Sequence, residues 1–142
     1  MKKHNSFGRI LGLDVGTKRI GVAISDESRI LASGLETIYV LYLEQAIDDI
    51  ISIMNEYYIS DVFVGLPVNT DGTESASAGF IRNFTEQLSA KTVVPVHYAD
   101  ERFTTTLAHR QLHELGKQPS RNRDVVDQMA ACNILQSVLD KL

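Results

Sequence analysis

Three carboxylates lie next to or within apolar segments of this sequence, where an acid is unusual. They are Asp14, Glu101 and Asp127. If they meet in the folded chain, their charges repel and their pKa values rise unless a cation neutralises them. Ligands that are all oxygen favour Mg²⁺ or Mn²⁺. Two such ions about 4 Å apart can activate a water molecule and stabilise the leaving oxygen of a phosphodiester. The three acids therefore suggest metal-dependent hydrolysis.

The first acid, Asp14, closes the first apolar run of the chain. It could simply shape the turn that follows, a common role for aspartate, and for this residue alone that explanation is the stronger one. Gly12 and Asp14 share one face of the predicted strand, so we expect Gly12 to leave open space beside the acid.

The second acid, Glu101, and its neighbour Asp100 follow another apolar run, residues 93–99. Acids are favoured at the start of a helix, so both could begin one. That explanation does not account for their position directly after a predicted strand. Ligands of open α/β sheets bind beyond the carboxyl ends of the strands. We therefore keep this pair as a candidate site.

The third acid, Asp127, lies on a stripe of the last predicted helix that is otherwise apolar. The stripe consists of Asp127, Ala131, Ile134, Val138 and Leu142. Such a stripe should face the sheet, and a carboxylate rarely faces a core unless something pairs with it. Asp127 could complement the helix dipole, but Asp124 is already a good N-cap. We expect Asp127 to point inward.

The elements that must position these acids follow the order β-β-β-α-β-α-β-α-α. We predict strands at 10–15, 20–25, 30–40, 62–66 and 93–99, and helices at 43–57, about 75–88, 104–115 and 124–142. Three successive strands with short connections predict an antiparallel meander. Alternating units after a meander predict an α/β fold, with a mixed five-stranded sheet flanked by helices.

Length and composition are those of an ordinary globular domain. The chain has 142 residues, 44% apolar and 23% charged, which suits a single domain over 1–142. Its one cysteine, Cys132, cannot form an internal disulfide, and we expect it to pack in the core. No long apolar run follows the basic N-terminus, so we expect neither a signal peptide nor a membrane span, and a cytoplasmic location.

The net charge of −4 weighs mildly against nucleic-acid binding. A site made of carboxylates lowers net charge, however, while basic residues elsewhere can hold phosphates. Six basic residues are candidates: Lys18, Arg19, Arg102, Lys117, Arg121 and Arg123. The first two could equally be a solvated hairpin tip. The last three lie in a predicted loop, 117–123, that could track a nucleic-acid backbone or be a solvated connection.

Four segments resemble the motifs of the YqgF/RuvX family, in the family's order and over nearly the whole chain. They are LGLDVGTKRIGVA at 11–23, GLP at 65–67 with DGTE at 71–74, DERFTT at 100–105, and VDQMAA at 126–131 with IL at 134–135. Residues 75–77 and Phe103 depart from the usual pattern. Neither departure replaces one of the three acids, so we expect them to affect how the substrate fits and not catalysis.

The resemblance implies a ribonuclease H-like fold related to the RuvC resolvases, and a nuclease activity. Members of this family are named either as Holliday junction resolvases or as pre-16S rRNA processing enzymes of ribosome biogenesis. By motif, the family's catalytic and metal-binding acids fall on Asp14, Glu101 and Asp127, and Asp100 and Asp124 are flanking acids. A junction resolvase needs two active sites and hence a homodimer, whereas an RNA processor does not.

Three other interpretations were weighed. His109 and His113 have zinc-binding spacing, but neither an HExxH pattern nor a cysteine ligand accompanies them. An actin-like nucleotide-binding phosphotransferase shares the ribonuclease H-like core, but it needs two such domains and this chain has room for one. A non-catalytic nucleic-acid module would be expected to lose acids, whereas this chain keeps all three.

Phe80 and Phe84 have helical spacing and are expected in the core.

Overall fold

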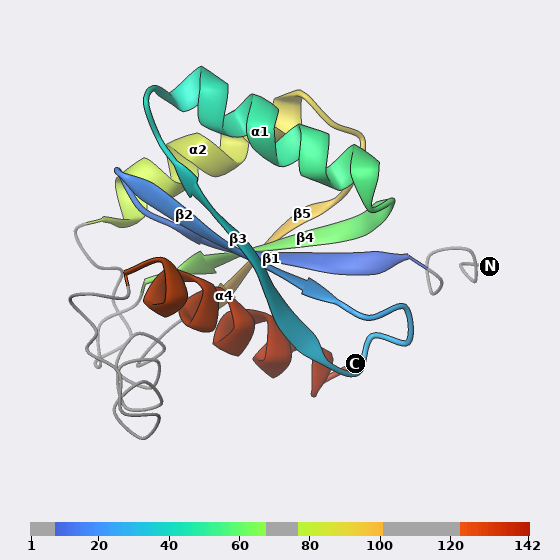
Figure 1. The fold of residues 1–142 in the computed structure, drawn as a ribbon. Helices are drawn as coiled ribbons and strands as arrows, with labels where there is room; N and C mark the ends of the chain where they lie inside the picture. The colour runs from blue at the N-terminus through green and yellow to red at the C-terminus, as the bar shows by residue number, and fades with distance from the viewer. Residues whose placement is uncertain (1–7, 68–76, 101–122) are drawn as a thin grey trace.

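The computed structural model describes residues 8–67, 77–100 and 123–142 (Figure 1). Its five strands form one sheet in the order β3-β2-β1-β4-β5. The strands are β1 Arg9–Val15, β2 Arg19–Ser25, β3 Ala32–Tyr39, β4 Ile59–Leu66 and β5 Val96–Asp100. The first three form an antiparallel meander, and β4 and β5 run parallel to β1. The predicted mixed sheet is confirmed.

Helices cover both faces of this sheet (Figure 1). They are α1 Leu43–Glu56, α2 Ala78–Ala90 and α4 Arg123–Leu139. One apolar core joins α1 and α2 to Leu11, Leu13 and Val15 of β1, while Ile10 packs with α4 on the other side. The period-two alternation of β1 therefore assigns its residues to faces as expected. No described helix could cross a membrane.

Glycines let α4 lie almost on the backbone of the sheet. A Cβ atom at Gly12 would be 2.8 Å from the Leu135 Cβ, and one at Gly21 would be 2.0 Å from the Asp127 carbonyl oxygen. The expectation of open space beside Gly12 was therefore wrong, because α4 fills that space. In a close-packed interior a missing side chain is occupied by a neighbour.

The apolar stripe of α4 is inward as predicted over its first half and not at its end. Ala131 and Ile134 are buried. Val138 is partly exposed, and Leu142 lies beyond the last helical residue and is 71% exposed. Leu139 is buried instead, so the inward face of the last turn is displaced by one residue from the predicted stripe.

Several boundaries shift at exposed apolar residues. Ile30 and Leu31 lie in a turn before β3, where the Asp26 carboxylate accepts both of their N–H groups, and Val93 is fully exposed before β5.

Phe84 is in the core, with Phe80 packed against it, and Cys132 packs beside Ala131 and Leu135. Burial raises the pKa of the Cys132 thiol to about 11. The helix predicted at 104–115, with His109 and His113, lies outside the described residues.

Candidate active site

Asp14 and Asp127 line the same cleft, at the edge where β1 and β4 end. The cleft has a volume of about 250 Å³ and is lined by Asp14, Val15, Gly16, Thr17, Lys18, Arg19 and Asp127. Both carboxylates are partly exposed, so solvent and a ligand can reach them. Two of the three predicted acids, from opposite ends of the chain, are thus brought together.

The close approach at Gly21 explains how these acids meet. Asp14 is the register partner of Gly21 in the β1–β2 ladder. The Asp127 backbone lies directly over Gly21, so close that a Cβ atom there would be 2.0 Å from its carbonyl oxygen. Residues paired across a ladder project to the same face. Asp14 therefore projects toward the helix that carries Asp127.

Arg19 is the cation that now partners Asp127. Its Nε donates a hydrogen bond to Asp127 Oδ2 at 2.8 Å, and the two side chains are only 27% and 18% exposed. Burial raises the pKa of the Asp127 carboxyl, and the Arg19 guanidinium partly offsets this effect. Because burial disfavours the ionised form of this carboxylate, a nearby cation stabilises it.

The turn between β1 and β2 shapes one wall of the cleft. The Gly16 N–H donates to the Arg19 carbonyl at 2.9 Å, and a Cβ atom at Gly16 would lie 2.8 Å from that same oxygen. Only glycine fits so tight a closure. The turn leaves Lys18 exposed, beside the acids.

The first turn of α4 is held by β3, which revises two predictions. Asp124 accepts a short hydrogen bond from the Tyr39 hydroxyl, and its carbonyl accepts one from Thr37 Oγ1 at 3.0 Å. Asp124 lies inside the helix and is not its N-cap. Arg123 is the first described residue of α4 rather than part of a loop, and it is exposed. These contacts to β3 keep the helix regular through Arg123.

Asp100 is the last residue of β5 and is paired in register with Leu66. The ring of His97 stacks on Phe63 at 4.6 Å, and Phe63 belongs to the core beneath α4. Because strand residues alternate between faces, Asp100 lies on the face opposite to His97 and α4, and hence opposite to Asp14. Glu101, Arg102, Lys117 and Arg121 lie outside the described residues.

A metal ion fits the donors of this cleft. Both carboxylates offer oxygen, the ligand type of Mg²⁺ and Mn²⁺. Within residues 8–67, 77–100 and 123–142, no three His, Cys, Asp or Glu side chains gather as a metal site. Among the described residues, Asp14 and Asp127 could supply two ligands to such an ion.

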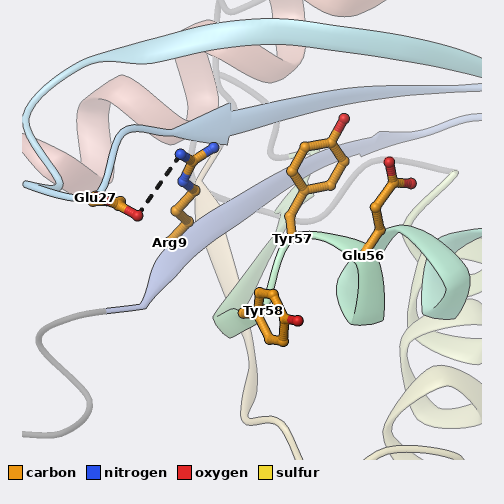
Figure 2. A pocket seen from close by; sticks show the side chains of 5 residues that line it. All are labelled: Arg9, Glu27, Glu56, Tyr57 and Tyr58. Atoms are coloured by element: carbon orange, nitrogen blue, oxygen red, sulfur yellow. Dashed lines mark ion pairs between the residues drawn. The ribbon is translucent and has the colours of Figure 1, made fainter.

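A second hollow of about 280 Å³ lies at the opposite edge of the sheet, where β1 begins (Figure 2). It is lined by Arg9, Glu27, Glu56, Tyr57 and Tyr58. Arg9 is 4.0 Å from Glu27, whose side chain is 78% exposed. Although slightly larger, this hollow holds no pair of shielded carboxylates, so volume does not decide which site is catalytic.

Comparisons with known proteins identify the family of this chain. Residues 8–141 match the RuvX family, described as "Holliday junction resolvase". Proteins of Moorella thermoacetica and Roseiflexus, both named "Putative pre-16S rRNA nuclease", are 43% and 38% identical to the chain. These alignments cover 94% of the chain and 96% and 94% of the two relatives.

Solved structures show the same fold. Thermus thermophilus RuvC, in complex with a Holliday junction substrate, superposes with a TM-score of 0.58 at 13% identity over 94% of both chains. The Fowlpox virus resolvase, solved with Holliday junction DNA, gives 0.53 at 12% identity over 94% of this chain and 97% of its own. The fold is ribonuclease H-like. The chain belongs to the RuvX family and is a nuclease, a hydrolase acting on ester bonds.

Proposed function

We propose that this nuclease is metal-dependent, with Asp14, Glu101 and Asp127 as its catalytic and metal-binding residues, and that it processes the 5′ end of pre-16S rRNA. The observation that supports the proposed metal site is that Asp14 and Asp127 line the same cleft. The placement of Asp100 on the other face favours Glu101 as the third ligand. The names of the relatives support the RNA substrate.

The three acids would hold Mg²⁺ or Mn²⁺, and we propose two ions. When bound, such ions activate a water molecule and stabilise the charge on the leaving oxygen. The chain's own residues hold and orient the substrate: Lys18 and Arg19 at the cleft are placed to bind phosphate. Arg102, Lys117, Arg121 and Arg123 are proposed to extend this contact along the backbone. For this RNA-processing role we propose a cytoplasmic location.

A Holliday junction is the alternative substrate, supported by the family's description and by the resolvase fold. The deciding experiment incubates purified protein with a precursor 16S rRNA fragment and a four-way DNA junction, side by side with Mn²⁺. We expect cleavage of the RNA at its 5′ end. Cleavage of the junction alone, by a protein that is dimeric in solution, would replace the RNA proposal with the resolvase. No cleavage of either would contradict catalysis.

Metal binding can be tested without activity. Mg²⁺ or Mn²⁺ should raise the melting temperature, because a ligand that binds only the folded state stabilises it. Asp14→Asn removes one charged ligand and should abolish the rise. A metal response that is unchanged in Asp14→Asn would remove this residue from the site.

Arg19 adds a second test, since it now holds the carboxylate that a metal would use. Arg19→Gln removes a positive charge from the site, so Mn²⁺ should bind more tightly, on the order of tenfold for charges a few ångströms apart in a solvated site. Nucleic-acid binding should weaken at the same time. Weaker Mn²⁺ binding, measured by calorimetry, would instead make Arg19 a residue that orients Asp127 for the metal.

The basic residues Lys117, Arg121 and Arg123 should contribute to affinity and not to the chemical step. Neutralising all three should weaken binding and flatten its salt dependence. Each lost phosphate contact removes about 0.7–0.9 from the log–log slope. Lys141→Gln, beyond the far end of α4, is the control and should leave the slope unchanged. Equal slopes for the triple variant and the parent would show that these residues do not touch the backbone.

A further inference from the structure

We propose that Tyr39 and Tyr42 form a stacking surface for unpaired nucleobases of the substrate, beside the acid cleft. The inference rests on the proposed nuclease function and narrows its substrate to nucleic acid with an unpaired segment near the cut. The rings lie at the end of β3 and just before α1. No step assigned to the catalytic residues uses them.

Contacts between β3 and the cleft place Tyr39 next to the site, and Tyr42 follows it three residues later. Tyr39 is the register partner of Arg19, and its hydroxyl donates to the Asp124 carboxylate. The Val40 N–H donates to the Lys18 carbonyl at 2.9 Å. Figure 1 shows that α1 and α4 begin at the same end of the sheet, on its two opposite faces.

The segment is exposed and yet fixed. Tyr39 is 55% exposed, Leu41 81% and Tyr42 63%, an unusual cluster of uncovered large side chains for so short a stretch. Gln45 clamps its backbone: Oε1 accepts from the N–H groups of Leu41 and Tyr42 at 2.9 and 3.3 Å, and Nε2 donates to the Tyr39 carbonyl at 3.2 Å. A surface fixed in advance loses little entropy on binding.

Two exposed cations and two acids border this surface. Lys18 and Arg123 are both exposed, one on the turn bonded to Val40 and the other next to Asp124 in the chain. Of the neighbouring acids, Asp124 is bonded to Tyr39, and Glu44 lies 3.8 Å from Lys91. Bases stack on aromatic rings whatever their sequence, while basic residues follow the backbone. Rings and cations here stand side by side, as that mode of binding requires.

The test measures binding without cleavage. A single-stranded oligonucleotide carrying 2-aminopurine is titrated in EDTA, and its fluorescence reports stacking. Tyr42→Ala should lower affinity about tenfold, the scale of one lost base–aromatic stack, with an unchanged salt slope. Tyr42→Leu keeps apolar bulk without the ring and should lose as much. Tyr42→Phe keeps the ring and should bind like the parent.

Tyr58→Ala is the matched control. Tyr58 is 85% exposed and lies near Arg9 at the opposite edge of the sheet (Figure 2), so its loss should change neither affinity nor fluorescence. Equal affinity of Tyr42→Ala and Tyr58→Ala, with cleavage intact, overturns the stacking surface and leaves the nuclease proposal standing. Normal stacking without cleavage of any substrate overturns the nuclease proposal instead. A parent protein that binds no nucleic acid overturns both.

Discussion

Replacing any one of the three acids by its amide should reduce nuclease activity by orders of magnitude while leaving the protein folded. The variants are Asp14→Asn, Glu101→Gln and Asp127→Asn. Each swap keeps the shape of the side chain and removes one charge that a metal needs, and the metal supplies both nucleophile activation and charge stabilisation. A double variant should be hardly worse than a single one, because residues that act as a unit are not additive. Cleavage rates and circular dichroism measure the two halves of this prediction.

Stability distinguishes catalytic acids from structural ones. Burial raises the pKa of the Asp127 carboxyl, so its ionised form costs stability at pH values above that pKa. An amide removes this cost and can still accept the hydrogen bond from Arg19 Nε. Metal-free Asp127→Asn should therefore be no less stable than the parent at neutral pH. Asp124→Asn is the control and should stay active, since an amide oxygen can accept from the Tyr39 hydroxyl. Full activity of Asp127→Asn would point to Asp124 instead.

Gly21→Ala should have the largest effect on stability. The added methyl group would meet the Asp127 carbonyl oxygen at 2.0 Å and its carbonyl carbon at 2.4 Å. These are backbone atoms, so no side-chain rotation relieves the clash, and α4 must move off the sheet. We expect a loss of about 3 kcal/mol, the upper range for overpacking. Activity should fall too, since a displacement of about 1 Å can cost about a hundredfold in rate.

Two other glycines provide graded controls in the same unfolding experiment. A Cβ atom at Gly34 would meet only the Gln128 side chain, at 2.9 Å from its Oε1, and one at Gly79 would meet nothing within 4 Å. Gly34→Ala should be mild because Gln128 can shift. Gly79→Ala, in α2, should stabilise by about 0.5–1 kcal/mol. If Gly21→Ala were as stable as these variants, the contact between α4 and β2 would not be as close as described.

Much of the architecture follows from the sequence because periodicity reports burial directly. The alternation around Leu11 and Leu13, and the inward direction of Asp127, were both predictable from spacing alone. Boundaries were less so: Ile30 and Leu31 look like strand residues, but the Asp26 carboxylate holds their N–H groups in a turn. Apolar character cannot reveal such a competing hydrogen bond.

The contacts that the site residues make could not be predicted from the sequence. Arg19 was predicted to bind phosphate and Asp127 to bind metal, yet here they bind one another. Their contact depends on how closely α4 approaches β2, a distance set by Gly21. The exposed Tyr39 and Tyr42 were missed because nothing in their spacing separates a surface ring from a core ring. The role proposed for them rests on their exposure and on their bonds to Asp124 and Gln45, which only the structure shows.

The position of α4 in the chain has a consequence during synthesis. Asp127 follows all five strands, so a ribosome must translate every strand of the sheet before Asp14 and Asp127 can meet. Until then the sheet shows a bare face over Gly12 and Ala23, where Ala131 and Leu135 later pack. A nascent chain at this stage lacks one of its proposed metal ligands.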